Sequence, residues 1–93
     1  MSSRTVTVGS TVGLHARPAS LLVQAAARQN VPVTLTKAGG EPVDARSILL
    51  VLGLDARHGD SLTVSAEGEG ADDAVAAIAA LVASDLDASP VAG

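Results

Sequence analysis

Three short segments of the chain alternate polar and apolar residues, and this pattern constrains the fold more than any other feature. Residues 5–8, 33–37 and 61–66 each place every second side chain on one apolar face, as β-strands with a single buried side do. Residues 41–45 follow the second segment after a turn that contains two glycines, which predicts a β-hairpin. Pro42 has no N–H to give to a neighbouring strand, so we expect its strand at an edge of the sheet.

Two longer segments repeat apolar residues at helical spacing. The first begins at about Ala16 and is expected to end near Asn30, with Pro18 tolerated because it sits in the first turn. The second covers residues 71–86 and has acidic residues in its first turn, where they favour the helix dipole. The predicted buried stripes are Ala19, Leu22, Val23 and Ala26 in the first helix and Val75, Ile78 and Val82 in the second.

A third, shorter helix is expected over the apolar run 48–52, with Ser47 as its N-cap and an end near Gly53. A buried strand is the alternative for so short a run. The element order is then βαββαβα, which predicts an α+β open-faced sandwich: a four-stranded antiparallel sheet with three helices packed on one face. We expect one domain over residues 1–88 and a flexible C-terminal tail over residues 89–93.

The composition narrows the possible functions. Hydrophobic residues make up 47% of the chain without any Phe, Tyr or Trp, so the core must be aliphatic. The absence of cysteine excludes disulfides, thiolate metal sites and a cysteine nucleophile. A net charge of −4 argues against nucleic acid as a partner. No apolar run approaches the roughly 20 residues needed to span a bilayer, and none resembles a signal core before the first strand, so we expect a cytoplasmic protein without membrane insertion.

Charge is distributed unevenly along the chain. Residues 1–40 contain four basic and no acidic residues, whereas residues 41–93 contain ten acidic residues and two basic ones. A basic first half is suited to receiving an anion. A chance division in a short chain is an equally good interpretation.

The segment 13–20 carries the strongest chemical signal, because a histidine stands directly before a helix. Backbone N–H groups at a helix N-terminus are unpaired and bind phosphate readily. Since Pro18 has no N–H, the donors expected nearest His15 belong to Ala16 and Arg17. The guanidinium of Arg17 matches phosphate oxygens, and Gly13 allows the chain to bend before the histidine.

Such an arrangement favours a nucleophilic histidine, whose ring nitrogen attacks phosphorus and holds the phosphoryl group covalently. A single histidine at a helix start is more often a capping or surface residue. Gly13, His15, Arg17 and Pro18 in this register, opening a helix after a strand, favour the phosphate site instead.

Residues 13–19, Gly-Leu-His-Ala-Arg-Pro-Ala, resemble the active-site motif of the HPr family, the histidine-containing phosphocarriers of the bacterial phosphoenolpyruvate-dependent sugar phosphotransferase system. The similarity covers nearly the whole chain, including a serine, Ser47, that opens a short apolar helix. The resemblance implies that phosphorylated enzyme I passes its phosphoryl group to Nδ1 of His15, which passes it to the IIA domains of sugar permeases. Arg17 would contact the group and help to release it.

The resemblance also implies a stoichiometric carrier rather than an enzyme. No extra apolar face is evident in the sequence, so we expect a monomer, and we expect neither a cofactor nor a metal. Two positions depart from the family pattern. Val12 stands where a polar Asn or Ser is common, so a side-chain cap from that position is lost. Leucines replace the methionine-rich patch of the second helix, which indicates a different preference for partners.

Ser47 and the helix behind it each have two interpretations. In some relatives the matching serine is phosphorylated by a regulatory kinase, whereas a plain N-cap is the alternative. Part of the apolar run must enter the core, and the remainder is a candidate docking surface, to which we assign Ile48, Leu49 and Leu52. Arg28, Arg46 and Arg57 are either a basic frame for acidic partners or ordinary solvated residues.

Competing functions remain open at this point. A regulatory binding module of the same fold would act through docking or through Ser47, and the presence of His15 and Arg17 argues for the carrier instead. Relays outside sugar transport also use carriers of this fold. A catalytic enzyme is disfavoured, because the chain has no acid–base pair or glycine-rich nucleotide loop. His58 is interpreted as a surface residue, since two histidines without an arranged carboxylate do not make a metal site.

Overall fold

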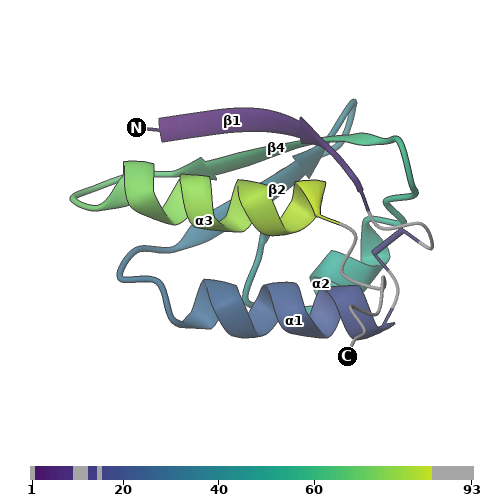
Figure 1. The fold of residues 1–93 in the computed structure, drawn as a ribbon, viewed down its shortest axis with the longest axis horizontal. Helices are drawn as coiled ribbons and strands as arrows, with labels where there is room; N and C mark the ends of the chain where they lie inside the picture. Colours follow the sequence, from purple (N-terminus) through teal and green to yellow (C-terminus); the bar gives the residue numbers. More distant parts are fainter. Residues whose placement is uncertain (1, 10–12, 15, 85–93) are drawn as a thin grey trace.

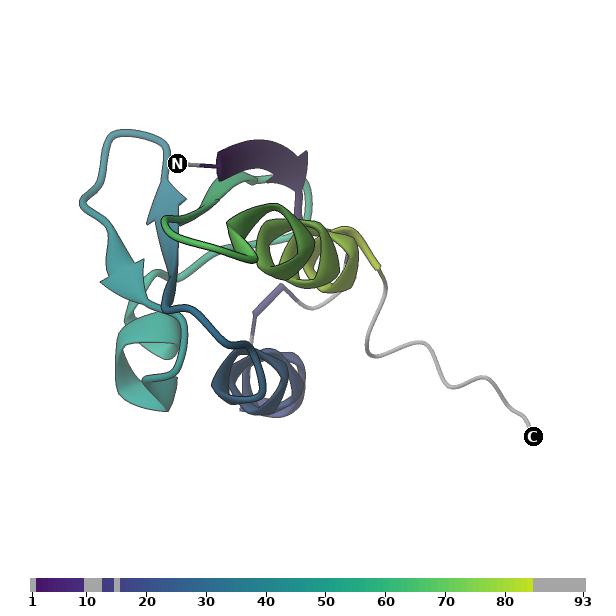
Figure 2. The ribbon, with the colours of Figure 1, turned by 90° about the vertical axis from the view of Figure 1, so that its left-hand side faces the viewer.

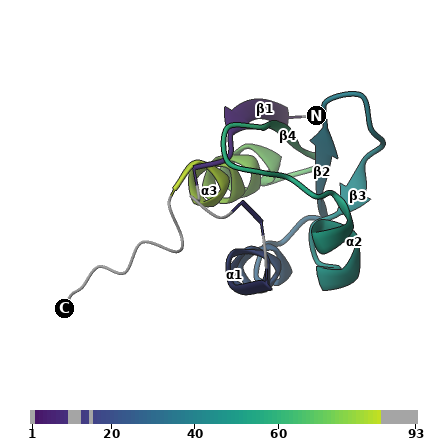
Figure 3. The ribbon, with the colours of Figure 1, turned by 90° about the vertical axis from the view of Figure 1, so that its right-hand side faces the viewer.

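A computed structural model describes residues 2–9, 13–14 and 16–84. Its elements are β1 (Ser2–Thr7), α1 (Ala16–Ala27), β2 (Val33–Lys37), β3 (Val43–Asp44), α2 (Ile48–Gly53), β4 (Ser61–Ala66) and α3 (Ala71–Ala83). The strands form one antiparallel sheet in the order β1-β4-β2-β3, and the three helices lie against the same face of it (Figures 1 and 3). The predicted α+β open-faced sandwich is therefore confirmed.

The first strand begins earlier than its sequence pattern indicates. It runs from Ser2 to Thr7 rather than over residues 5–8, because all six of its residues pair with β4. Val8 has already left the strand, and its N–H donates to the carbonyl of Asp60 at 2.8 Å. Pairing with β4 thus extends the strand through residues that do not alternate, and just beyond its end Val8 is hydrogen-bonded to the turn before β4.

The hairpin of β2 and β3 lies at the opposite edge of the sheet, as Pro42 predicts. The strand β2 has its predicted bounds, but β3 contains only two residues instead of the five of residues 41–45. Pro42 has no N–H to donate, which limits pairing on its side. On the other side, Ala45 donates its N–H to the carbonyl of Val33 at 2.9 Å, outside the regular ladder.

The core lies between the sheet and the helices and is entirely aliphatic. Its largest fully buried side chains include Leu22 from α1, Leu35 and Leu62 from the sheet, Val51 from α2 and Ile78 from α3. The opposite face of the sheet carries hydroxyl side chains. Thr5 and Thr63 on neighbouring strands lie within 2.9 Å of each other through their hydroxyl oxygens. This division between the two faces explains why β2 and β4 alternate so regularly.

Both long helices end sooner than predicted. Helix α1 stops at Ala27, since the next two N–H groups, those of Arg28 and Gln29, donate to carbonyls three residues back. Helix α3 stops at Ala83, because Ser84 adopts an extended conformation and donates its hydroxyl to the carbonyl of Ala80 at 2.7 Å. The predicted tail and the domain boundary at residue 88 lie outside the described residues.

The short apolar run forms helix α2, as predicted. The hydroxyl oxygen of Ser47 accepts a hydrogen bond from the N–H of Leu50 at 3.3 Å, which makes Ser47 the N-cap. Helices α1 and α2 lie side by side beneath the sheet (Figure 2). None of the helices in the described part of the chain is long and apolar enough to cross a membrane.

Candidate functional site

The N-terminus of α1 is the centre of the candidate site. Helix α1 begins at Ala16, and both Ala16 and Arg17 are exposed, whereas Pro18 is buried in the first turn. The first N–H groups of an α-helix have no partner within the helix, and Pro18 lacks one altogether. The N–H groups of Ala16 and Arg17 therefore lie at the end of α1 that follows His15 in the chain. His15 itself lies outside the described residues, as does Val12.

The segment between β1 and α1 is hydrogen-bonded to the rest of the molecule on each side: at Val8 and Gly9, just after β1, and at Leu14, just before α1. At the first end, the N–H of Val8 donates to the carbonyl of Asp60, and the carbonyl of Val8 accepts from the N–H of Gly59 at 3.0 Å. Next to it, the N–H of Gly9 donates to the carbonyl of Val82 near the end of α3 at 2.9 Å. These bonds join the end of β1 to the turn before β4 and to α3.

At the second end, the N–H of Leu14 donates to the carbonyl of Ala56 at 2.9 Å, and the side chain of Leu14 is buried in the core. Gly13 has a φ of +75°, and a Cβ atom there would lie 2.6 Å from the carbonyl oxygen of Ala56. Glycine is thus required by both backbone conformation and space. The sequence predicted a bend at Gly13 but not this close approach to Ala56.

The turn that receives these bonds is itself held by a carboxylate. Asp60 accepts a hydrogen bond from the N–H of Arg57 at 2.9 Å and forms a salt bridge with Lys37 at 3.5 Å. The hydrogen bond from Arg57, and to a smaller extent the positive charge of Lys37, lowers the pKa of Asp60. Neither Asp60 nor Lys37 stands out in the sequence, because no local pattern links these distant positions.

A similar turn precedes α2. Asp44 accepts hydrogen bonds from the side chain of Arg46, at 3.2 and 3.1 Å, and from its backbone N–H at 2.9 Å. These interactions, the side-chain hydrogen bond above all, lower the pKa of Asp44. Because Arg46 folds back onto Asp44, its charge is partly satisfied within the chain. Ser47, the next residue, is half-buried at the start of α2.

Helix α2 presents an apolar surface to the solvent. Leu49 is 78% exposed, and Ile48 and Leu52 are also exposed, whereas Val51 is fully buried. As expected, one residue of the apolar run 48–52 enters the core and others face the solvent. The sequence did not assign two further exposed leucines: Leu50, which also lies on α2, and Leu21, which lies on the neighbouring helix α1. Leu21 lies outside the predicted buried stripe of α1, and this position in the sequence could have indicated that its side chain is exposed.

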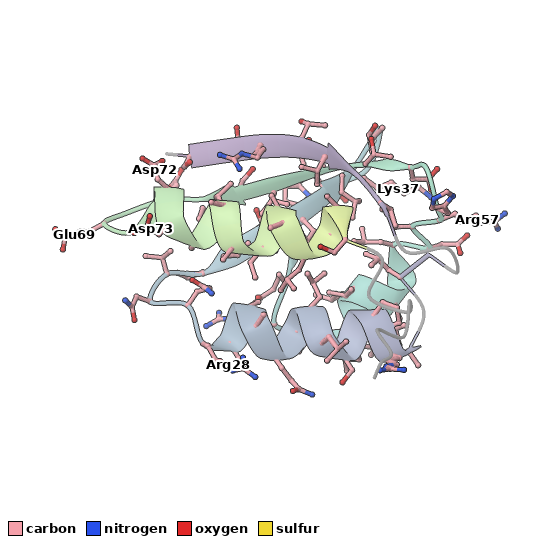
Figure 4. All side chains as sticks on the ribbon, viewed as in Figure 1. Arg28, Lys37, Arg57, Glu69, Asp72 and Asp73 are labelled. Carbon is pink, nitrogen blue, oxygen red and sulfur yellow. The ribbon has the colours of Figure 1, made fainter. Side chains whose placement is uncertain are left out.

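The basic residues of the first half of the chain do not gather at one site. Arg28 lies just beyond the far end of α1 from Arg17, so it does not frame the start of that helix (Figure 4). Lys37 and Arg57 lie at the end of the molecule where α1 begins, and Glu69, Asp72 and Asp73 lie at the opposite end (Figure 4). Arg57 pairs with Asp55 at 3.2 Å in an exposed position, and His58 is exposed in the same turn, as predicted.

Comparisons with known proteins match this chain over most of its length. A family model described as PTS HPr component phosphorylation site matches residues 2–84. The phosphocarrier protein HPr of Streptomyces coelicolor is 49% identical over 90 residues, which cover 97% of each chain. The crystal structure of HPr-C-His from Thermoanaerobacter tengcongensis superimposes with a TM-score of 0.86 at 31% identity, over 96% of this chain and 99% of that one. The crystal structure of a phosphocarrier protein HPr from Bacillus anthracis superimposes with a TM-score of 0.82 at 37% identity, over 87% of this chain and 95% of that one.

Proposed function

The chain belongs to the HPr family of phosphocarrier proteins of the phosphotransferase system, and we propose that His15 is the residue that carries the phosphoryl group. The observation that carries this proposal is the position of His15 in the chain. It stands between Leu14, which is buried and bonded to Ala56, and the exposed first turn of α1. The chain contains one other histidine, His58, which lies in the exposed turn before β4.

The proposed reaction is a transfer between two histidines. The lone pair of Nδ1 of His15 attacks the phosphorus atom carried by a histidine of enzyme I. The new P–N bond forms as the P–N bond to the donor breaks, and the donor ring nitrogen leaves with its electron pair. Nε2 of His15 keeps its proton throughout. The second transfer, to a IIA domain, reverses this chemistry, so the chain is a stoichiometric carrier that is regenerated in each cycle.

The start of α1 stabilises the charge on the transferred group. The N–H groups of Ala16 and Arg17 donate to phosphate oxygens, and the positive end of the helix dipole adds to their effect. The guanidinium of Arg17 neutralises part of the charge as the phosphorus atom passes between nitrogens. Because Arg17 is exposed, its guanidinium is accessible to the donor and the acceptor protein.

The exposed apolar residues of α2 are the proposed docking surface for enzyme I and the IIA domains. Ile48, Leu49 and Leu52 form its predicted part, and Leu50 and Leu21 enlarge it. Several large apolar side chains exposed on one short helix of a small protein are typical of a protein–protein contact. The carrier is proposed to act as a monomer in the cytoplasm, where phosphoenolpyruvate is made.

A second role is favoured by the position of Ser47 at the edge of this surface. Its hydroxyl caps α2, so a phosphate there would sit at a helix N-terminus and next to exposed leucines. We propose that phosphorylation of Ser47 weakens docking by placing charge beside an apolar contact. This regulatory function and the carrier function use different residues and are separable by mutation.

The carrier function is tested by incubating the protein with phosphoenolpyruvate and enzyme I, and by following the phosphate that it gains. We expect one phosphate per chain that is lost in acid and stable in base, as a phosphohistidine is. His15→Ala should gain none, whereas His58→Ala should behave like the wild type. Phosphate on the His15→Ala variant, or none on the wild type, would show that the proposal is wrong.

A further inference from the structure

The turn before β4 is organised around a single carboxylate oxygen. One oxygen of Asp60, Oδ2, accepts from the backbone N–H of Arg57 at 2.9 Å and lies 3.5 Å from the ammonium nitrogen of Lys37. The N–H of Asp60 also donates to the carbonyl of Arg57 at 2.9 Å, so residues 57–60 form a closed turn. Gly59 within it has a φ of +90°, a conformation that glycine adopts without strain.

Lys37 connects this turn to the sheet. It is the last residue of β2, a central strand, and its ammonium group also donates to the carbonyl of Asp55 at 3.1 Å. That carbonyl belongs to the peptide unit directly before Ala56. Asp60 and Lys37 therefore hold the segment 55–60 from both sides of Ala56.

The same segment holds the chain that leads into the phosphoryl-transfer site. The carbonyl of Asp60 accepts from Val8, and the carbonyl of Ala56 accepts from Leu14, the residue directly before His15. A chain of direct contacts thus runs from Lys37 and Asp60 through Ala56 to Leu14. Its two charged members are partly exposed and belong to no buried cluster, so their contribution to the core is small.

We propose that Asp60, together with Lys37, is a positioning residue for phosphoryl transfer, which acts on His15 through the Ala56 carbonyl and the Leu14 amide. The proposal rests on His15 as the phosphoryl acceptor. Displacement of a reacting atom by about 1 Å can lower a rate by up to about 100-fold. Loss of Asp60 should therefore lower the rate of transfer while leaving the docking surface on α2 intact.

The test compares Asp60→Ala with Asp44→Ala as a matched control. Both substitutions remove a carboxylate that accepts from a backbone N–H and pairs with a basic side chain, but only Asp60 lies in the turn bonded to Val8 and Leu14. Phosphorylation by enzyme I is measured over a range of carrier concentrations, which gives kcat and KM separately. Exchange of the Leu14 amide with deuterated water is measured by NMR without phosphate.

We expect Asp60→Ala to lower kcat about 10-fold at an unchanged KM and to speed exchange of the Leu14 amide about 10-fold. Asp44→Ala should leave both kcat and the exchange within about twofold of the wild type. Lys37→Met, which keeps the turn bond between Asp60 and Arg57, is the second variant if Asp60→Ala fails to fold, and kcat should fall there too.

The inference is overturned if Asp60→Ala keeps the kcat of the wild type, or loses no more than Asp44→Ala does. It is also overturned if exchange of the Leu14 amide does not change in Asp60→Ala or, should that variant not fold, in Lys37→Met. Should the wild type accept no phosphate at all, the proposed function fails, and the exchange of the Leu14 amide alone then decides the link between the turn and the site.

Discussion

The backbone amide of Leu14 donates a 2.9 Å hydrogen bond to the carbonyl of Ala56, and this bond joins the residue before His15 to a turn far along the chain. Gly13 lies against the same carbonyl, where a Cβ atom would be only 2.6 Å from its oxygen. The segment before α1 and the turn before β4 are therefore in close contact as well as hydrogen-bonded. The site at the start of α1 is therefore shaped by a long-range contact in addition to its own short motif.

Gly13→Ala is expected to damage this contact. The new methyl group would meet the carbonyl oxygen of Ala56 at 2.6 Å in a backbone conformation, φ +75°, that alanine avoids. We expect a loss of about 2 kcal/mol or more in the free energy of unfolding, together with slower phosphorylation. Urea unfolding and the enzyme I assay measure the two effects.

Gly39→Ala is the control for Gly13→Ala. Gly39 has a similar φ of +81° but open space around the position of a Cβ atom. Its substitution should cost about 1 kcal/mol from backbone strain alone and should not slow phosphorylation. Equal losses of stability in the two variants would show that the contact with Ala56 is unimportant.

Leu49→Ala and Leu22→Ala should separate docking from stability. Leu49 is 78% exposed, so its truncation should change the free energy of unfolding by less than about 0.5 kcal/mol and raise the KM of the carrier for enzyme I. Leu22 is fully buried, and its truncation should cost about 2–5 kcal/mol. A KM for Leu49→Ala equal to that of the wild type would show that Leu49 is not part of the docking surface.

Ser47→Ala should lower the stability of the protein by about 1 kcal/mol, because the N–H of Leu50 loses its capping partner. Transfer to His15 should be unaffected. Ser47→Asp keeps an oxygen for the cap and adds negative charge, so it should be about as stable as the wild type and have a raised KM for enzyme I. A KM unchanged in Ser47→Asp would leave Ser47 with the capping role only.

Acid should destabilise the fold through Asp44 and Asp60. Folding lowers the pKa of both carboxyl groups below the value of about 3.9 that they have in an unfolded chain. The unfolded chain therefore binds protons first as the pH falls, and the stabilisation present above about pH 4 is lost below it. Urea unfolding at pH 7 and pH 3.5 should show this loss, and it should be smaller in the Asp44→Asn, Asp60→Asn double variant. An equal loss in that variant would assign the effect to other acids.

Arg17→Ala should fold like the wild type, since Arg17 is exposed, and should transfer phosphate at least about 10-fold more slowly. Arg17→Lys keeps the charge but not the paired donors, and we expect it to recover only part of the rate. Rapid-quench measurement of both transfers, from enzyme I and to a IIA domain, checks this role. Rates equal to those of the wild type would leave Arg17 without a part in transfer.

Local sequence patterns were sufficient to predict the elements whose regularity depends only on neighbouring residues. The alternation of β2 and β4 and the Ser47 cap of α2 each depend on neighbouring residues, and the structure has them as predicted. The start of β1 at Ser2 was not predictable, because residues 2–4 do not alternate and become a strand only by pairing with β4. The end of α3 was missed because the expected helix was carried on to Leu86, whereas Ser84 is extended and donates its hydroxyl to the carbonyl of Ala80.

The candidate site, too, has a part that local sequence patterns predict and a part that depends on long-range contacts. The motif around His15 is local, so the sequence alone was enough to predict a phosphate site there and the helix that begins at Ala16. The contact of Gly13 with Ala56 and the turn held by Asp60 and Lys37 join segments that are distant in sequence. No spacing rule for helices or strands relates such positions, and only the folded chain shows them together.

The site of phosphorylation is identified by NMR of the protein phosphorylated by enzyme I and phosphoenolpyruvate. If His15 carries the phosphoryl group on Nδ1, a sample labelled with ¹⁵N in histidine should show a ³¹P–¹⁵N coupling to Nδ1 of His15 and an unchanged spectrum for His58. A coupling to Nε2, a phosphate on His58 or a phosphate on a hydroxyl oxygen would contradict this assignment.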